Sequence, residues 1–325
     1  MPRTPHPQLD VVGLGYCSYD ILALTPEMPE FDAPAGAHLD DLVTDGGGPV
    51  GTALVALARL GARAGYVGLL GDDAEGRWLR EQFVHEGVDV TRLRTREEVG
   101  TNLCLVLVDG AGRRAILCQR RVSAGDLSLT GADRVAIQGA RVLHLDGQFL
   151  PAAIQAARWM REAGGIVCFD GFHLRPGLDE LLPLVDWLVV AESFPARYTG
   201  GGDPEAAARE LLALGPELLV VTMGQKGSRA WTKSERLQVP AFPVQVVDTT
   251  GAGDAFHGGL IYGMLQAWGL ERVLLFASAV AGLNCQTLGG RRGLPALDQV
   301  EALLRTGVPS NQPLVGHRQS RDRGG

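Results

Sequence analysis

The sequence predicts an α/β protein whose mostly parallel sheet is covered by helices on both faces. From residue 141 onward, short apolar segments alternate with helical ones. The apolar segments cover 141–146, 166–170, 186–191 and 217–224, with helices expected over 151–165 and 204–215. Strands and helices that alternate through short joints are typical of a parallel sheet. A second observation is that two stretches, 16–45 and 99–121, depart from this alternation, which predicts a small accessory sheet.

The first part of the chain begins with the same pattern. Residues 10–15 form a short apolar run that ends in glycine, as a buried strand does. A glycine turn at 45–48 then leads into a helix that stops near Gly61. Residues 64–71 predict another strand, and the helix after it has acidic residues in its first turn, where the helix dipole favours them.

Turn residues and periodicity define the remaining elements. Residues 99–121 contain two extended runs around Asp109–Gly110, which predicts a hairpin. A small β excursion is expected over 229–247, followed by helices over 253–268 and 270–284. The polar end of the chain, residues 308–325, predicts a loose tail.

Composition and charge limit the classes of function. The 325 residues are 46% apolar and 21% charged, and the formal net charge is −7, which argues against non-specific binding to nucleic acid. No apolar run reaches the ~18 residues of a membrane span, and no secretion signal begins the chain. We therefore expect a cytoplasmic protein with no membrane partner. The five cysteines lack C-x-x-C spacing, and we interpret them as unbonded thiols rather than disulfides or zinc ligands.

The segment VDTTGAGDAFHGG, residues 247–259, carries the strongest chemical signal. Gly251, Ala252 and Gly253 stand between an extended segment and a helix, and Asp254 follows them. Free N–H groups at a helix start attract anions, and glycine lets a phosphate approach the backbone. No G-K-[ST] follows, so the segment is not a Walker A loop. It indicates an anion hole beside a carboxylate that can take a proton from a hydroxyl group. An ordinary glycine turn before a helix is the alternative.

Three segments together resemble one enzyme family. DTTGAGDAF with its glycine-bearing helix resembles the C-terminal signature of the ribokinase-like (PfkB) family of carbohydrate and nucleoside kinases. GGGPVGTALVALARLGA with YVGLLGDDAEG resembles the N-terminal signature, and VVTMGQKG resembles the nucleotide-side strand and turn. The match in order and spacing runs from about Asp10 to Leu304. It implies a three-layer α/β/α fold with a central mostly parallel sheet and a small β-sheet lid.

The resemblance also implies a domain organisation and roles at the sugar end of the site. Residues 1–307 would form a single kinase domain, with the lid at about 16–45 and 99–121 and the flexible tail after it. Asp254 would be the catalytic base beside the anion hole. Asp20, Gly47 and Gly48 would bind the sugar, because a carboxylate accepts hydrogen bonds from two hydroxyls and glycines bring the backbone close.

On the nucleotide side the resemblance implies a second group of residues. The turn residues that would contact the nucleotide are Thr222, Gly224 and Gly227. Asn284 would face the adenine, although a helix-interior asparagine with a local partner is an equal alternative. Asp248 would help to bind a monovalent cation such as K⁺, with carbonyl groups around Thr287 to Arg292, or it could simply cap its turn.

The sequence departs from the family pattern in two places. The N-terminal signature commonly carries an asparagine that contacts the substrate, in the form GGxxxN, and here that position is Gly51. The GGGP…TA form instead resembles the branch that contains sulfofructose kinases. The NxxE motif, which orders Mg²⁺ and water, is replaced by Ala191 and Phe194, with Glu192 as the candidate substitute. Mg²⁺ is still expected for chemistry with ATP.

Four arginines lie in the hairpin of an acidic protein: Arg113, Arg114, Arg120 and Arg121. They could form a solvated edge that discourages strand pairing. Alternatively, one of them could clasp a phosphate- or sulfonate-bearing sugar with bidentate geometry. Strand alternation would place Arg120 and Arg121 on opposite faces, so at most one would face the substrate, and Arg121 is the candidate.

The function that these patterns predict is ATP-dependent phosphorylation of a hydroxyl group on a sugar or sugar derivative. A nucleoside kinase of the same family is the nearest alternative, but the hairpin has no aromatic residue to stack on a base. A silent sugar- or nucleotide-binding protein is the alternative from another class, and the Asp254 motif argues against it. A Rossmann oxidoreductase is disfavoured because GLGYCS lacks the third glycine of G-x-G-x-x-G. Homodimerisation through the accessory sheet is also expected.

Overall fold

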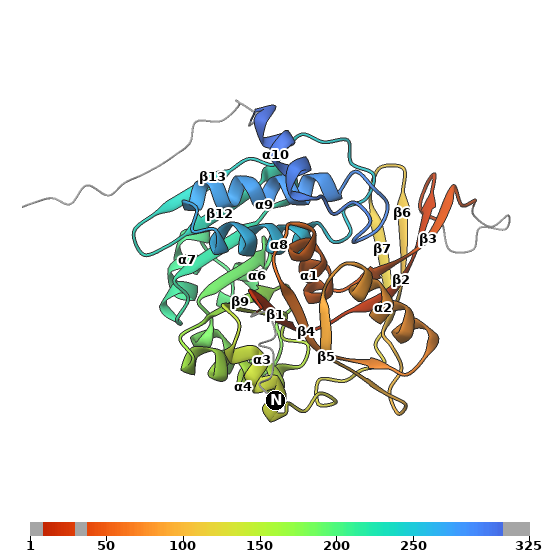
Figure 1. Ribbon diagram of the computed structural model, residues 1–325. Coiled ribbons are helices and arrows are strands. Elements are labelled where there is room, and N and C mark those ends of the chain that lie inside the picture. The colour runs from red at the N-terminus through yellow and green to blue at the C-terminus, as the bar shows by residue number, and fades with distance from the viewer. Residues whose placement is uncertain (1–8, 30–37, 308–325) are drawn as a thin grey trace, which may run out of the picture.

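A central sheet runs through the computed structural model (Figure 1), which describes residues 9–29 and 38–307. Within these residues nine strands form the sheet in the order β13-β12-β11-β10-β9-β8-β1-β4-β5. The strands are β1 (Val11–Leu14), β4 (Ala64–Gly71), β5 (Asp89–Arg96), β8 (Val142–Leu145), β9 (Ile166–Gly171), β10 (Trp187–Ala191), β11 (Leu218–Thr222), β12 (Ser228–Trp231) and β13 (Arg236–Val239). The predicted α/β class is confirmed.

The direction of the strands decides where loops can gather. Every neighbouring pair from β11 to β5 is parallel, whereas the pairs β11–β12 and β12–β13 are antiparallel. Every residue of β1, β4 and β8 is buried, because both faces of these strands are covered. The carboxyl ends of parallel strands meet at one edge of the sheet, so the loops after β1, β8, β9, β10 and β11 share that edge.

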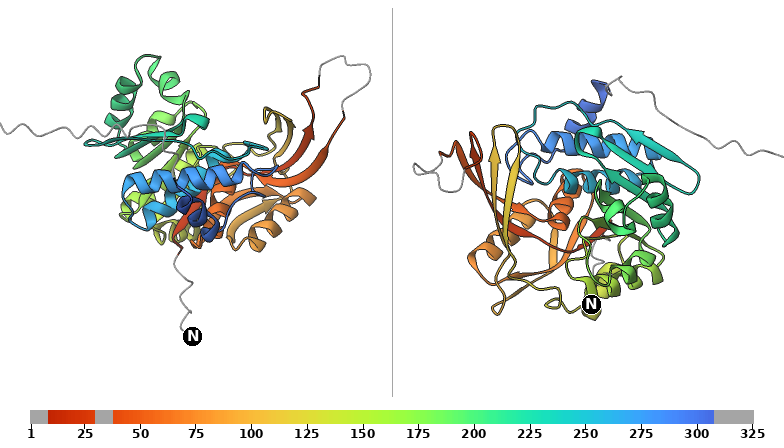
Figure 2. Two further views of the ribbon diagram at one scale, coloured as in Figure 1. Left: turned by 90° about the horizontal axis from the view of Figure 1, so that it is seen from above. Right: turned by 180° about the vertical axis from the view of Figure 1, so that it is seen from behind.

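Helices cover the two faces of the sheet and enclose two separate apolar cores (Figures 1 and 2). One face carries α1 (Pro49–Arg59), α2 (Ala74–His85), α8 (Ala252–Leu265), α9 (Leu270–Asn284) and α10 (Leu297–Arg305). The other carries α3 (Gly131–Gln138), α4 (Leu150–Glu162), α5 (Leu178–Leu181), α6 (Phe194–Thr199) and α7 (Pro204–Ala213). Short 3₁₀ turns occur at η1 (Leu182–Leu184) and η2 (Gly224–Lys226).

Local sequence explains the start of α2 and the burial of α8. Asp73 caps α2 by accepting a hydrogen bond from the N–H of Gly76 at 2.8 Å, as expected of an N-cap aspartate. Helix α8 is buried on nearly all sides and is apolar all round, as the central helix of a core must be. Its glycines allow close packing: a Cβ at Gly258 would lie 2.6 Å from the Cβ of Ala56 in α1, and one at Gly259 would lie 2.8 Å from the Cα of Ala277 in α9.

A second, four-stranded sheet has the order β3-β2-β6-β7. It consists of β2 (Ser18–Thr25), β3 (Asp41–Gly47), β6 (Leu103–Asp109) and β7 (Arg114–Gln119). It projects from the body of the molecule, as both views of Figure 2 show. The accessory sheet expected from residues 16–45 and 99–121 is therefore present, and we call it the small sheet.

Some elements were not expected from the sequence. Strand β5, DVTRLRTR, is polar because it forms an edge of the central sheet, and helices α3 and α10 are short. Helix α8 was expected to begin at 253 and end at 268, whereas it spans Ala252–Leu265. The predicted tail, 308–325, lies outside the described residues.

The interpretation of all five cysteines as unbonded thiols was wrong for two of them. Cys104 in β6 and Cys118 in β7 occupy directly opposite positions of an antiparallel pair, and their sulfur atoms are bonded. This pairing depends on the hairpin register, which the spacing of cysteines along the chain does not reveal. Cys17, Cys168 and Cys285 are buried and unbonded.

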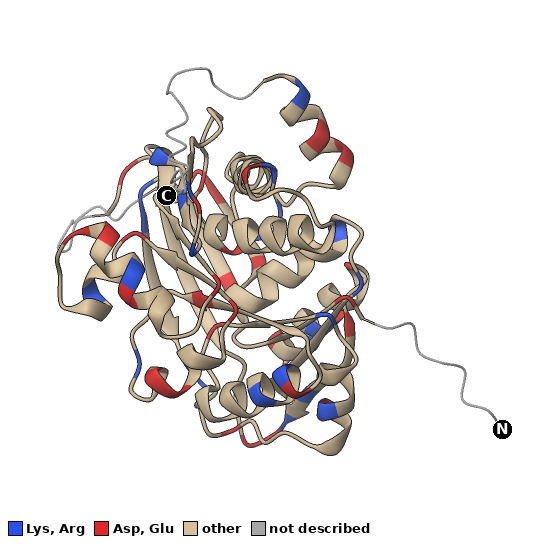
Figure 3. Ribbon diagram, turned by 90° about the vertical axis from the view of Figure 1, so that its left-hand side faces the viewer, with Lys and Arg blue, Asp and Glu red and all other residues tan. Residues whose placement is uncertain are grey.

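The placement of charged and apolar residues in the structure agrees with the composition of the chain. In the view of Figure 3, basic and acidic residues are interspersed on the side that faces the viewer. Across residues 9–29 and 38–307, no helix has both the length and the apolar character needed to cross a membrane.

Candidate active site

The turn before α8 presents free N–H groups at the carboxyl edge of the central sheet. Gly251, the N-cap of α8, has φ 73°, and a Cβ there would lie 2.5 Å from the carbonyl oxygen of Gly290, so glycine is required. The N–H of Ala252 donates to the oxygen of Thr249 at 3.2 Å. Within the described chain, the N–H groups of Gly251, Gly253 and Asp254 donate to no protein acceptor. Of the three expected donors, the N–H of Ala252 is thus already hydrogen-bonded. The N–H of Asp254 is a free donor that was not expected.

Asp254 lies beside this anion hole and is half-buried. Burial raises the pKa of its carboxyl group, and the negative charge of Asp170 at the end of β9 raises it further. His257, one turn later in α8, donates from Nδ1 to the oxygen of Gly253 at 2.8 Å, and Nδ1 lies 3.6 Å from Oδ2 of Asp170. A carboxylate of raised pKa is a stronger base than an exposed one, so the arrangement suits proton removal from a hydroxyl group.

Asp20 lies in β2 and its carboxylate faces Gly47 of the N-terminal signature. The side chain is 5% exposed, and Oδ1 accepts a hydrogen bond from Ser18 Oγ at 2.5 Å. A Cβ at Gly47 would overlap Oδ2 of Asp20, and Gly48 has φ 90° as the N-cap of α1. Burial raises the pKa of Asp20 to about 7, and the charges of Asp45 and Asp254 act in the same direction. Asp20 and Asp254, which are far apart in the sequence, are therefore close enough to interact.

The predicted nucleotide-side residues lie at the same edge of the sheet. Thr222 ends β11, and its Oγ1 donates to the oxygen of Val190 in β10 at 3.3 Å. Gly224 and Gly227 have φ 56° and 86°, and the turn η2 between them is exposed. Asn284 is fully buried, with Nδ2 donating to the oxygens of Thr250 (3.3 Å) and Gly290 (3.1 Å). Asn284 thus has protein partners, and they lie in the anion-hole turn and in the loop after α9.

Asp248 fixes the anion-hole turn to the loop after α9. The side chain is fully buried; Oδ1 accepts from the N–H of Thr250 at 2.8 Å, and Oδ2 accepts from the N–H of Gly289 at 3.0 Å. The turn-capping contact expected as one alternative is therefore made. Both loops are also joined through Asn284, so the turn is held on two sides.

The departures from the NxxE pattern have a structural basis. Ala191 ends β10, and Phe194 is fully buried in the core, where no metal-ordering side chain could act. Glu192 is exposed and forms an ion pair with Lys226 at 2.9 Å. In the described part of the chain, no three His, Cys, Asp or Glu side chains lie together as a metal site. Mg²⁺ that arrives with a nucleotide needs only one or two carboxylates besides the phosphates, and Glu192 and Asp170 at this edge fit such a role.

The arginines of the hairpin differ in their surroundings. Arg113 pairs with Asp109 at 2.7 Å. Arg114 donates from Nη1 to Oγ1 of Thr249, directly before the anion hole. The guanidinium of Arg121 donates from Nε and Nη2 to Gln119 Oε1 at 2.9 and 2.7 Å. The expected alternation of Arg120 and Arg121 along a strand was wrong, because β7 ends at Gln119.

Sequence reasoning missed three basic residues near this edge. Burial lowers the pKa of Arg175, and the charge of Arg120 lowers it further. Burial also lowers the pKa of His173, with the charges of Arg175 and Arg120 as further causes. Arg291 lies in the loop between α9 and α10, and its side chain is 4% exposed. These positions come together only through the topology, so no local pattern in the sequence could have identified them.

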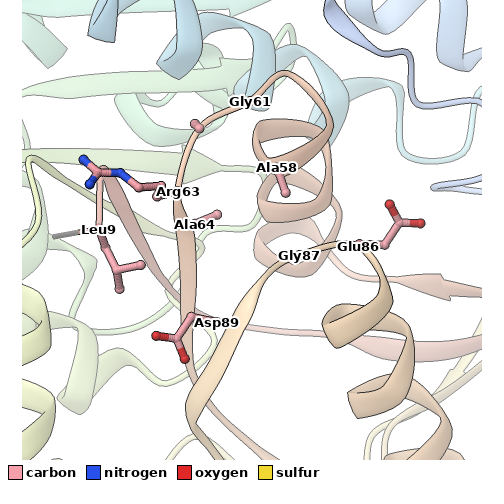
Figure 4. Close-up of a pocket in the computed structure, with 9 residues that line it drawn as sticks. Leu9, Ala58, Gly61, Arg63, Ala64, Glu86, Gly87 and Asp89 are labelled. Carbon is pink, nitrogen blue, oxygen red and sulfur yellow. The ribbon is translucent and has the colours of Figure 1, made fainter. Parts of the chain in front are cut away.

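A cavity of about 300 Å³ lies elsewhere, at the opposite edge of the sheet (Figure 4). It is lined by Ala64 and Asp89, the first residues of β4 and β5. Its two other charged residues are already paired, Arg63 with Asp10 at 2.8 Å and Glu86 with Arg59 at 2.7 Å. The candidate site is therefore the carboxyl edge, where the anion hole and the unpaired carboxylates lie.

Substituting Asp20 by Asn should stabilise the protein increasingly as the pH rises. The folded state keeps the Asp20 proton up to about pH 7, whereas the unfolded chain loses it near its ordinary pKa of about 4. The native protein therefore loses stability between pH 4 and 7, and Asn removes this loss. The difference in unfolding free energy between variant and native protein, from urea titrations at several pH values, should grow across that range to at most about 4 kcal/mol. A difference that does not change with pH would contradict the burial of an ionisable carboxyl here.

Comparisons with known proteins agree with this fold and this site. The sequence is 34% identical over 301 residues to a fructokinase of Klebsiella pneumoniae, covering 83% of this chain and 97% of that one. It is 31% identical to the aminoimidazole riboside kinase of Salmonella typhimurium, covering 79% and 87%. Arabidopsis thaliana ribokinase complexed with ribose and ATP superimposes with a TM-score of 0.81 and 27% identity, covering 91% and 99%.

A family description covers nearly all of the described chain. The family is the pfkB family of carbohydrate kinases, and the match covers residues 8–297 of this chain. The predicted resemblance to this family is confirmed, whereas the finer resemblance to sulfofructose kinases is not. The match, together with the ribokinase fold and a carboxylate beside an anion hole at the carboxyl edge of the sheet, shows that the chain belongs to the pfkB family of carbohydrate kinases.

Proposed function

We propose that this kinase transfers the γ-phosphoryl group of ATP to a hydroxyl group of an anionic sugar, with Asp254 as the general base. The observation that carries the proposal is the position of Asp254, a partly buried carboxylate of raised pKa beside free N–H groups at the start of α8. The names of the relatives, fructokinase and ribokinase, support a sugar as the acceptor.

In the proposed reaction the carboxylate of Asp254 takes the proton of the sugar hydroxyl. The sugar oxygen forms a bond to the γ-phosphorus while the bond to the β-phosphate oxygen breaks, and ADP leaves. The N–H groups of Gly251, Gly253 and Asp254 donate to the oxygens of the transferring group, each worth about 3 kcal/mol by analogy with oxyanion holes. Arg114, fixed at Thr249, adds a positive charge beside them. Bound Mg²⁺ would offset the charge of the phosphates.

The other expected roles complete this proposal. Residues 1–307 would act as one kinase domain, and the small sheet would be its lid, excluding water from the transfer. Thr222, Gly224 and Gly227 would support the nucleotide, and Glu192 would reach Mg²⁺, with Asp170 as a second carboxylate that the sequence did not single out. Asp248 would help to bind K⁺, since each of its oxygens accepts one backbone N–H group and keeps a further lone pair. Since ATP is the donor, we place the enzyme in the cytoplasm.

The choice of an anionic sugar depends on Arg120 and Arg175. Their charges act on one another, and Nε of Arg175 is buried without a partner. Nη2 of Arg175 donates to Gln148 Oε1 at 3.0 Å, which holds the guanidinium beside the loop after β8. Two neighbouring cations repel each other, and a phosphate, sulfonate or carboxylate on the sugar would relieve this repulsion.

Replacement of Asp254 by Asn should abolish most of the turnover. General base catalysis contributes about 10²- to 10⁴-fold, so kcat should fall by that factor while the affinities for sugar and ATP change little. A coupled assay of ADP release with a panel of neutral sugars, anionic sugars and nucleosides measures this, and the exposed Asp72→Asn serves as the matched control. Turnover by Asp254→Asn at the native rate, with the fold intact by circular dichroism, would overturn the assignment of the base.

Replacement of Arg120 or Arg175 by Met should raise KM for an anionic sugar about tenfold or more, since a charged hydrogen bond is worth about 1.5–3 kcal/mol. The KM for ATP should stay the same. Arg121→Met is the matched control, because the guanidinium of Arg121 is already bound to Gln119. Equal effects of the three variants, or activity confined to neutral sugars in the panel, would exclude an anionic acceptor.

Two chains should associate through the small sheet. Every residue of the edge strand β7 is exposed, and Leu42, Ile116 and Leu117 are 59%, 48% and 62% exposed. An exposed apolar edge strand is normally covered by a partner. Sedimentation velocity should therefore find a dimer, and Ile116→Lys together with Leu117→Lys should convert it to a monomer. A monomer at every concentration tested for the native chain would contradict this.

A further inference from the structure

The loop between α9 and α10 places a buried arginine under the glycines of the N-terminal signature. The side chain of Arg291 is 4% exposed, and its guanidinium lies over the ring of Phe83 at 4.6 Å from the centroid. Nη2 donates to the oxygen of Gly47 at 2.6 Å, and Nε donates to Oγ1 of Thr52 at 3.4 Å. Nη1 is buried and has no hydrogen-bond partner.

The guanidinium occupies space that two glycines leave free. A Cβ at Gly46 would overlap Nη1, and a Cβ at Gly51 would overlap Nη2. Gly51 is the position at which the family signature commonly carries an asparagine. In this chain a side chain at Gly51 and the guanidinium of Arg291 are mutually exclusive, so the guanidinium occupies the space next to position 51.

The charge of Arg291 is not neutralised by a direct ion pair. Among the described residues no carboxylate pairs with it; Oδ2 of Asp45 accepts from its backbone N–H at 2.8 Å instead. A buried cation without a partner is unfavourable. The field of this cation reaches two carboxyl groups, since it favours the ionised forms of Asp20 and Asp254.

We propose that Arg291 is a positioning residue of the sugar site: its Nη2 fixes the carbonyl group of Gly47, which lies against Asp20, and its buried positive charge favours the carboxylate form of Asp20 over the protonated form. An ionised Asp20 accepts hydrogen bonds from two sugar hydroxyls, whereas the protonated form must donate one. Arg291 acts through Asp20 and Gly47 and does not contact the sugar itself, because its atoms are buried beneath the glycines. The inference depends on the proposed function only where it concerns sugar binding.

Asp20 faces a defined set of groups. The hydroxyl of Ser18 donates to it, and the carboxyl groups of Asp45 and Asp254 oppose its ionisation. The phenol of Tyr16 and the thiol of Cys17 lie near enough for the charge of Asp20 to raise their pKa values. Arg291 is the cation in this set, so its removal should shift the ionisation of Asp20 toward the protonated form.

The direct experiment is a titration of the free protein by carboxyl ¹³C NMR. Asp20 is assigned from the signal that Asp20→Asn removes. A neighbouring cation lowers the pKa of an aspartate by about 1–3 units, so Arg291→Met should raise the midpoint of Asp20 by about one pH unit or more. Arg291→Lys, which retains the charge, should leave it near the native midpoint. Arg291→Gln, which keeps a donor for Gly47, replaces the Met variant if that one does not fold. An unchanged midpoint in the folded neutral variant overturns the proposal.

Kinetics with a sugar that the native enzyme phosphorylates give a second measurement. We take the titration midpoint of Asp20 as about 7 in the native protein and about 8 in the Met variant. At pH 7 about half of the native molecules then have an ionised Asp20, compared with about one eleventh of the variant molecules. The sugar KM should therefore rise about fivefold at pH 7, and most of the difference should disappear at pH 9. A purely structural role predicts an equal rise at both pH values, which would contradict the proposal. Absence of turnover in the native enzyme would refute the proposed function and leave the NMR result intact.

Discussion

The site depends on how tightly the turn before α8 is held. Helix α8 is enclosed by α1 and α9, so its first turn cannot move without disturbing the core. Asp248 and Asn284 join that turn to the loop after α9 by hydrogen bonds of 2.8–3.3 Å. Free N–H groups stabilise a developing charge only if they do not have to reorient during the reaction. The polar residues that were candidates for ligand binding thus contribute first by fixing the geometry of the anion hole.

Burial of several carboxyl groups at one edge of the sheet has an electrostatic consequence. Asp20, Asp170 and Asp254 all have raised pKa values, with burial as the largest cause. Each is costly to ionise, and together they would repel one another. Arg114 and Arg291 approach from the small sheet and from the loop after α9, and their charges favour the ionised form of Asp254. The balance of these charges sets the fraction of Asp254 that is ionised, and can therefore act as a base, at neutral pH.

The sequence predicted the parts of this arrangement that follow from local patterns. Apolar runs predicted the parallel strands, the Asp109–Gly110 turn predicted the hairpin, and the glycine turn before Asp254 predicted a helix start with free N–H groups. Contacts between distant segments could not be predicted in this way. The bond between Cys104 and Cys118 depends on strand register, and the end of β7 at Gln119 leaves Arg120 and Arg121 outside the strand, so strand alternation does not apply to them.

Gly51 illustrates why a missing motif residue is hard to interpret from sequence alone. Its lack of a side chain suggested that a substrate contact had simply been lost. In the structure, the space belongs to Arg291, which is 240 residues away along the chain and holds the adjacent carbonyl of Gly47. A glycine at position 51 is therefore a requirement of this buried arginine. The N-terminal signature and the loop after α9 are one unit in three dimensions, and a substitution in either changes the environment of Asp20.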